Sequence, residues 1–371
     1  MKQTLGTLVT IIAAITILLG AAPAGFGQAK SLKVSKGGTL EVRLDGGDIH
    51  ISTSERDEVT VSGDDESLEV TQSGTTVRVA SGSESFGGSV RITIPSQFNI
   101  ELQTSFGEVQ VDGKLAGRVR AETGAGGIAL GDVNGTVELS TSGGDLKTGV
   151  LNGDGTLRTS GGDIQVKSAG GQLDVKTSGG DIRVGNVGKT LRASTSGGDV
   201  SIGDVGGEAK VSTSGGNIRA GKANGKVSLA TSGGDIDLEG GNGTVSAATS
   251  GGNVNIKDVS GSVDASSAGG EIYAEIIPSG KGKSKLTTAG GNVTLLLPEN
   301  AKASIEARIR IQRHWRGQHE DFSIQSDFTA DKTSENKDEI LARYTLNGGG
   351  EQITLETVNS DILIKKLRKE R

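Results

Sequence analysis

A row of acidic and amide side chains returns at a fixed spacing, and it is the part of this sequence best suited to chemistry. It belongs to the motif Thr-Ser-Gly-Gly-Asp/Asn, whose copies begin at a constant interval at Thr141, Thr159, Thr177, Thr195, Thr213, Thr231 and Thr249. If the copies stack along one edge, their carboxylates repel one another, and a divalent cation such as calcium would relieve that repulsion. The candidates for a cation-binding edge are Asp145, Asp163, Asp181, Asp199 and Asp235.

The same row also has a structural interpretation, which we favour. Asp and Asn side chains close turns by accepting hydrogen bonds from nearby backbone amides. Basic residues two positions further on balance the charge, as at Lys147, Arg183 and Arg219. The motif also lacks the third glycine of the Gly-Gly-x-Gly-x-Asp repeat of calcium-binding β-rolls. We therefore expect no cofactor, with calcium as the alternative. We also expect no catalytic residue, and substitution of Asp181 and Asp199 would test whether the acidic row is catalytic.

Two further rows accompany the acidic one. The first is the threonine that begins each motif, a pattern that ice-binding solenoids also show. Alternation from the inward-facing Leu191 and Ala193 predicts that Thr195 points inward as well, so we expect these threonines to be structural. The second row is outward-facing and small, which suits lateral packing against another rod or simple exposure to water. Its members are Ser194, Ser212, Ser228, Ala230, Ser246, Ala248 and Ser266.

A pair of histidines is the remaining candidate for metal chemistry. His314 and His319 flank Trp315, and Glu320 or Asp321 could complete a metal site. The histidine spacing matches no helical metal motif, so we expect an exposed capping loop here. The sequence contains no Gly-x-Ser-x-Gly elbow, no phosphate-binding loop and no His-Glu-x-x-His motif, so these classes of enzyme are excluded.

The elements that must position these rows are short β-strands. Within each repeat, apolar and polar residues alternate, which is the signature of a strand. One apolar pair follows the Asp, as at Ile164 and Val166, and a second comes later in the same repeat, as at Leu173 and Val175. Turns with Asn-Gly or Gly-Gly separate the pairs. The pattern predicts an all-β, single-chain β-solenoid of ~18-residue coils with two short strands per coil, capped at both ends.

Amino-acid composition and net charge exclude several classes of protein and argue against one class of partner. The chain has 371 residues, with 61 Gly, 2% aromatic residues, no Cys and a net charge of −6. Glycine without a three-residue period excludes collagen, the missing Cys excludes a disulfide scaffold, and the acidic balance argues against nucleic acid as a partner. Lys2, the apolar stretch 5–22 and the small residues after it predict a secretory signal, or an uncleaved membrane anchor.

These patterns divide the chain into four parts. A signal or anchor is followed by irregularly spaced strands, then by the regular array, then by a closing region. The predicted parts are 1–29 for the signal, 30–103 for an N-terminal β cap, 104–300 for the repeat solenoid and 301–371 for a C-terminal β cap, within which 313–339 is a polar loop and Lys365–Arg371 a solvated basic tail.

Together with its flanks, the repeat resembles the bacterial putative adhesin family of β-strand-repeat proteins, a domain of unknown function. The family's name implies adhesion, and the family has no agreed catalytic residues. This sequence departs from the family's pattern in the charged segment 313–339. Besides the repeat units, the motifs that carry the resemblance are Ile92-Thr93-Ile94-Pro95, Leu295-Leu296-Leu297-Pro298, Leu346-Asn347-Gly348-Gly349-Gly350, Ile353-Thr354-Leu355 and Asp361-Ile362.

We therefore expect a non-enzymatic, exported β-solenoid that binds a glycan or protein as an adhesin or envelope module, in the periplasm or at the cell surface. Self-association between rods is a further expectation, and membrane contact is expected only through an uncleaved N-terminal segment. Two alternatives stay open. One is a periplasmic envelope scaffold or stress-associated protein. The other is a carbohydrate-active β-helix enzyme of polysaccharide lyase or hydrolase type, for which the array supplies carboxylates but, apart from Tyr273, no aromatic residue.

Overall fold

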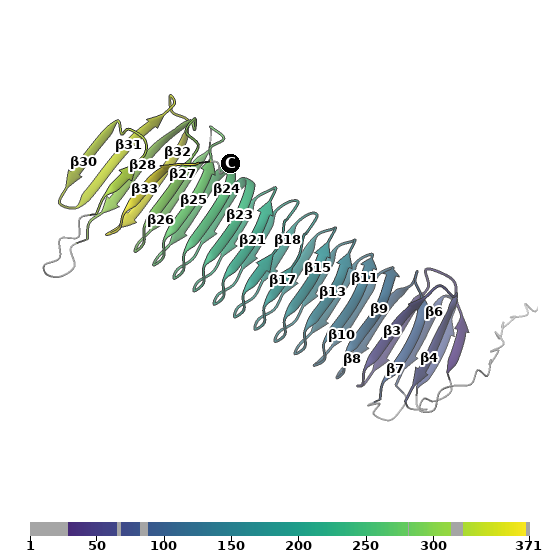
Figure 1. Cartoon of the computed structure of the whole chain (residues 1–371). Helices are drawn as coiled ribbons and strands as arrows, with labels where there is room; N and C mark the ends of the chain where they lie inside the picture. Colours follow the sequence, from purple (N-terminus) through teal and green to yellow (C-terminus); the bar gives the residue numbers. More distant parts are fainter. Residues whose placement is uncertain (1–28, 65–67, 82–87, 281, 313–321, 369–371) are drawn as a thin grey trace, which may run out of the picture.

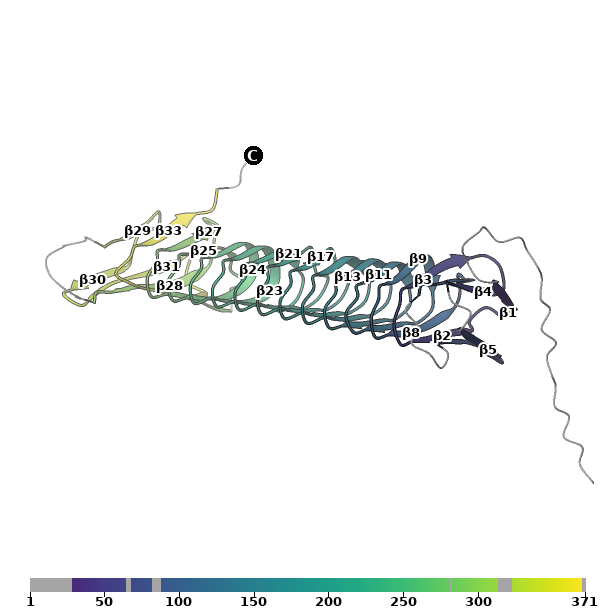
Figure 2. The same cartoon turned by 90° about the horizontal axis from the view of Figure 1, so that it is seen from below.

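Most of the chain is wound into one elongated rod of β-strands. The computed structural model describes residues 29–64, 68–81, 88–280, 282–312 and 322–368. Within these residues, 33 strands join in one mostly parallel sheet that winds around the long axis of the rod. The strands lie across that axis in Figure 1, and Figure 2 shows them in two layers. The expectation of an all-β, solenoid-like architecture is confirmed.

The two layers are called wall A and wall B here, and each coil of the regular array contributes to both. From the N-terminal end, wall A comprises β5 (Glu69–Ser73), β6 (Thr76–Ala80), β2 (Thr39–Leu44), β8 (Asn99–Thr104), β10 (Val119–Thr123), β12 (Val137–Thr141), β14 (Gly155–Arg158), β16 (Leu173–Lys176), β18 (Leu191–Ser194), β20 (Ala209–Ser212), β22 (Val227–Ala230), the second halves of β23 (Ile236–Ala248) and β24 (Val254–Ser267), then β26 (Lys283–Thr288), β32 (Glu351–Val358), β28 (Ala303–Arg310), β31 (Glu339–Leu346) and β30 (Lys332–Asn336).

Wall B carries the other strand of each coil. From the N-terminal end it comprises β1 (Lys30–Lys33), β4 (Glu58–Gly63), β7 (Val90–Pro95), β3 (Ile49–Ser54), β9 (Val109–Ala116), β11 (Ile128–Asn134), β13 (Leu146–Leu151), β15 (Ile164–Ala169), β17 (Ile182–Val184), β19 (Val200–Ile202), β21 (Ile218–Ala223), the first halves of β23 and β24, then β25 (Ile272–Ile277), β27 (Val293–Leu297), β33 (Ile362–Lys366) and β29 (Ile324–Ser326).

Parallel pairing stacks equivalent residues of successive coils. Val119 pairs with Val137, and the same offset of one repeat continues along wall A to Val263. After that, Asp264 pairs with Lys285 and not with Gly282, because three extra residues lie in the turn before β26. Neighbouring strands in a sheet are about 4.8 Å apart, so each position of the repeat forms a column along the rod with about that spacing.

Each coil buries residues from both walls and from the turn between them. Ile182 and Val184 of wall B and Leu191 and Ala193 of wall A are buried, as their alternation predicts. Val187 is buried as well, although it lies in the turn, and it forms β-bridges with the neighbouring coils. The predicted turn with Asn or Gly is present at this place in the coils, but the sequence analysis did not predict that the residue before it adds a third apolar column to the core. That column contains Val133, Leu151, Ala169, Val187, Val205, Ala223 and Val259.

Antiparallel strands close both ends of the rod. At the N-terminal end β1 pairs with β4, β4 with β7, and β5 with β6, all antiparallel. At the C-terminal end β28 pairs with β31 and β31 with β30 in the same sense. The outermost strand of wall A at this end, β30, has the sequence Lys-Thr-Ser-Glu-Asn and is exposed at every residue. Charged and polar side chains on such edges oppose pairing with another chain.

Two expectations about the C-terminal region are corrected by the structure. The segment 313–339 is not a loop throughout, since it contains β29 and β30, whereas residues 313–321, with both histidines and the tryptophan, lie outside the described residues. The basic tail is not wholly solvated either. Lys366 belongs to β33, and its Nζ lies 2.6 Å from the Glu299 carboxylate and 5.7 Å from the centre of the Phe328 ring.

The residues that the structure describes include no helix long and apolar enough to cross a membrane. The predicted signal or anchor falls almost entirely on residues 1–28, which lie outside the described residues. Cleavage, anchoring and export therefore stay predictions.

Candidate functional site

The acidic row forms a ladder of hydrogen bonds between coils. The Oδ1 atom of Asp145 accepts a hydrogen bond of 2.8 Å from the backbone amide of Asp163, and Asp163 does the same for Asp181. Asp181 continues the ladder to Asp199 at 2.9 Å. Five further bonds of this kind continue it at Asp199, Asn217, Asp235, Asn253 and Asn292. The structural interpretation correctly gave these side chains backbone partners, but the partners lie in the next coil and not in the same turn.

The Oδ2 atoms of two neighbouring carboxylates in the acidic row lie near one arginine side chain. Arg183 lies 2.7 Å from Oδ2 of Asp181 and 3.7 Å from Oδ2 of Asp163. Within the described ranges, no three His, Asp or Glu residues gather in a way that could hold a metal ion. A calcium-binding edge at Asp145, Asp163, Asp181, Asp199 and Asp235 therefore stays a prediction without further support.

The threonine row faces the core, as predicted. Thr177 is 1% exposed; its Oγ1 donates to the carbonyl of Gly162 at 2.8 Å and accepts from the amide of Gly180 at 3.4 Å. The same two bonds recur at Thr159, Thr195, Thr213, Thr231 and Thr249. These hydroxyl groups hold the corners together and are not presented to a ligand.

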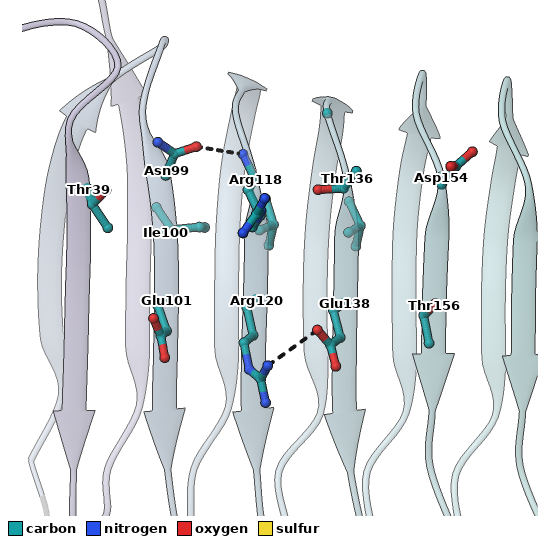
Figure 3. Close-up of a pocket in the computed structure, with 13 residues that line it drawn as sticks. Thr39, Asn99, Ile100, Glu101, Arg118, Arg120, Thr136, Glu138, Asp154 and Thr156 are labelled. Carbon is teal, nitrogen blue, oxygen red and sulfur yellow. Dashed lines mark hydrogen bonds and ion pairs between the residues drawn. The ribbon is translucent and has the colours of Figure 1, made fainter.

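Two depressions on the outer surface are the candidate sites, and neither was predicted from the sequence. The first has a volume of about 970 Å³ and lies on wall A over β8, β10, β12 and β14 (Figure 3). In its centre, Arg120 contacts Glu122 at 2.6 Å and Glu138 at 3.4 Å. The hydrogen bond to Glu122 and the charges of both glutamates raise the pKa of Arg120.

Polar and apolar residues together form the rest of the lining of this first depression. The backbone amide of Arg118 donates to the Asn99 side chain at 2.9 Å, which fixes the turn at its upper edge in Figure 3. Glu101, Thr136 and Asp154 line it as well, and none of its thirteen lining residues is aromatic. Its charges are mixed and its arginine at the centre is already paired, so it has little net charge to offer a ligand.

The second depression lies on wall B, over β9 to β19, and has a volume of about 690 Å³. We call it the wall B groove. Three basic side chains line it, from Lys147, Lys167 and Arg183, together with a single acidic one, from Asp112. Arg183 balances the acidic row as predicted, whereas Lys147 makes no ion pair with any residue that the structure describes. The sequence signal that could have revealed the groove is this excess of outward basic residues on neighbouring wall B strands.

Tyr273 is the aromatic side chain of the array that the sequence analysis singled out. Its hydroxyl group donates to the Glu275 carboxylate at 2.6 Å on the outside of β25. Partial burial, together with this hydrogen bond, raises the pKa of Tyr273 to about 12. Tyr273 lies outside both depressions, so it supplies neither with a stacking platform.

Comparison with solved structures finds proteins described as putative adhesins among those similar to this chain. A putative adhesin from Bacteroides fragilis is 11% identical, with 93% of this chain and 98% of that chain covered and a TM-score of 0.19. A putative cell adhesion protein from Clostridium sporogenes is 10% identical, with 91% and 99% covered and a TM-score of 0.16. A putative adhesin from Parabacteroides distasonis is 12% identical, with 92% and 97% covered and a TM-score of 0.24. TM-scores this low carry no argument about this chain.

Comparison with models of protein families identifies the family of this chain. No curated protein matches the chain. A family model described as Toastrack DUF4097 matches residues 38–203 and residues 172–365, two overlapping stretches that include the whole regular array. The resemblance to a repeat family of unknown function is thereby confirmed. The chain belongs to the Toastrack DUF4097 family.

Proposed function

We propose that the chain is an exported, non-enzymatic adhesin or envelope-binding module that binds through the side of its rod. The observation that carries this proposal is the stacking of equivalent residues, which turns both walls into long surfaces where an outward side chain returns in every coil. Extended surfaces of this kind are what repeat proteins use for binding. The two depressions lie on these surfaces, one on each wall.

A comparison of cell attachment tests the proposal. Cells that produce the chain and cells that lack it are applied to surfaces coated with glycans or with proteins. We expect stronger attachment of the producing cells to at least one coating, and we expect the purified protein to compete for that attachment. Equal attachment of both strains to every coating, with no competition, would remove adhesion and favour an internal envelope scaffold.

A polysaccharide lyase or hydrolase is the second candidate function, since carboxylates line both walls. The arrangement favours it less, because Glu138 is paired with Arg120 and Asp181 with Arg183, so neither carboxylate is free to act on a sugar. The enzyme would replace our proposal if the protein shortened an acidic polysaccharide and the substitutions Asp181→Ala and Asp199→Ala abolished that activity.

Lateral association of rods is a separate part of the proposal. The small residues Ser194, Ser212, Ala230 and Ala248 form one outward column on wall A, and the column beside it changes from Arg192 and Lys210 to Ser228 and Ser246. Close approach of two such walls needs small side chains. Sedimentation of the protein over a range of concentrations tests this, and a Ser212→Arg, Ser246→Arg variant should remain monomeric where the original chain associates. A monomer at every concentration would remove lateral association.

A further inference from the structure

The wall B groove has an unbalanced positive charge. Lys147 and Lys167 lie on adjacent strands, β13 and β15, and both are exposed. Neither side chain forms an ion pair or hydrogen bond with the residues that the structure describes. The single acidic residue of the groove is already engaged, because both carboxylate oxygens of Asp112 accept from the Gln110 amide at 3.0 Å. The two lysines are therefore available to a ligand.

Glycine keeps the groove open beside these lysines. Gly149, Lys167 and Gly185 occupy one column of wall B, in three successive coils. A Cβ atom added to Gly185 would collide with the carbonyl oxygen of Lys167, and one added to Gly149 would lie 2.9 Å from the carbonyl carbon of Gly131. Close packing of the coils thus excludes side chains from the positions next to Lys167 in this column, although the Asp132 carboxylate lies against Gly149 at one end of it.

Two of the cationic side chains in the wall B groove are spaced along the axis of the rod. Lys147, Gln165 and Arg183 form one outward column, in register across β13, β15 and β17. With a coil spacing of about 4.8 Å, the two cations of this column are about 10 Å apart, with an amide side chain between them. One sugar ring in an extended polysaccharide advances by about the same distance as one coil. A chain of sugars lying along the axis would therefore meet a new polar or basic side chain at each ring.

We propose that the wall B groove binds a linear, carboxylated polysaccharide laid along the rod axis. Lys147 and Lys167 contact the uronate carboxylates, and Gln165 exchanges hydrogen bonds with ring hydroxyl groups. Arg183 contributes less, because Asp181 and Asp163 already neutralise it. The inference rests on the proposed binding function and names its class of ligand. Charge and hydrogen bonds carry recognition here, since no aromatic side chain lines the groove.

Binding of the purified protein to polygalacturonate, which has one carboxylate on each ring, tests the inference. Dextran serves as the neutral polymer and single-stranded DNA as the polyphosphate. The test variant is Lys147→Gln, Lys167→Gln. The matched control is Lys176→Gln, Lys210→Gln, which removes the same charge from exposed positions on wall A. Circular dichroism of both variants establishes that they keep the β-sheet fold.

We expect the original chain to bind polygalacturonate, weakly at high salt, and to ignore dextran. The groove variant should bind roughly tenfold more weakly, from the loss of two charge-assisted contacts, while the wall A variant stays within about twofold. Equal affinities of the two variants would remove the groove as the site. Absence of binding to polygalacturonate, or tighter binding to DNA, would overturn the ligand class. Attachment of whole cells is read separately, so the adhesin proposal can stand while this inference fails.

Discussion

Thr148 and Thr177 are both buried threonines in the regular array, yet their hydroxyl groups have different surroundings. Thr177 uses its Oγ1 as donor and acceptor, whereas Oγ1 of Thr148 has no hydrogen-bond partner among the described residues. Thr148 stands in a column between Leu130 and Val166. A buried hydroxyl group without a partner costs about 1–3 kcal/mol, and a hydrogen bond contributes about 1 kcal/mol.

The substitution Thr148→Val should therefore stabilise the protein or leave it unchanged, since it exchanges an unpaired hydroxyl for a methyl group of the same shape. Thr177→Val is the matched control and should destabilise the protein by about 1–3 kcal/mol, because the carbonyl of Gly162 and the amide of Gly180 lose their partner. Urea unfolding of both variants measures the difference. Equal losses would show that Thr148 has a partner that the structure does not reveal.

At the scale of the element, the two glycines of each Ser-Gly-Gly corner differ in how much room the preceding coil leaves for a side chain. A Cβ atom on the second glycine, Gly198, would collide with the carbonyl oxygen of Gly180 in the preceding coil. A Cβ atom on the first, Gly197, would lie 3.1 Å from the carbonyl oxygen of Gly179. The chain itself has Ala125 where the register places a first glycine, next to Gly126.

We therefore expect Gly198→Ala to destabilise the protein by about 1–3 kcal/mol through overpacking, and Gly197→Ala to change stability by less than about 1 kcal/mol. Thermal unfolding followed by circular dichroism compares the two. If the alanine at position 197 proved as harmful as the one at position 198, the corner would be limited by backbone flexibility and not by the approach of the coils.

Glu351 forms hydrogen bonds with the segment that contains the three-residue insertion in the repeat. Its side chain is fully buried; Oε1 accepts from the Ser284 hydroxyl at 2.8 Å and Oε2 from the Ser279 amide at 3.0 Å. Glu351→Ala should cost about 1–3 kcal/mol by leaving both donors unsatisfied, and Glu351→Gln should cost less because one acceptor remains. Hydrogen exchange at the Ser279 amide reports the local effect. Unchanged protection in the alanine variant would contradict this role.

Much of this element-level structure follows from residue spacing, and the exceptions have physical reasons. Alternation placed Leu191, Ala193 and Thr195 in the core because a strand turns successive side chains to opposite faces. It missed Val187, since one apolar residue beside a glycine turn carries no periodicity. The two depressions were missed because they form between coils, where neighbours in space are a whole repeat apart in sequence.

At the scale of the whole molecule, stability should grow coil by coil, as in other repeat proteins. Deleting residues 195–212 removes one complete coil and joins Ser194 to Thr213, which continues the motif in register. This variant should keep a β-sheet spectrum and a cooperative unfolding transition. Deleting residues 195–203 removes half a coil, which exchanges the two kinds of corner between neighbouring coils and puts the charged Asp204 at the buried position of Thr195, so this variant should not fold. Folding of both variants, or of neither, would contradict the stacking of interchangeable coils.

The central claim is that the rod binds its ligand outside the cell, and labelling of unbroken cells tests this claim most directly. An antibody against the regular array is applied to intact cells before and after treatment with protease, with a cytoplasmic protein as the control that must survive. Our account predicts strong labelling of intact cells, and its loss under protease without lysis. Labelling that appears only after the envelope is opened would contradict adhesion and place the rod inside as a scaffold.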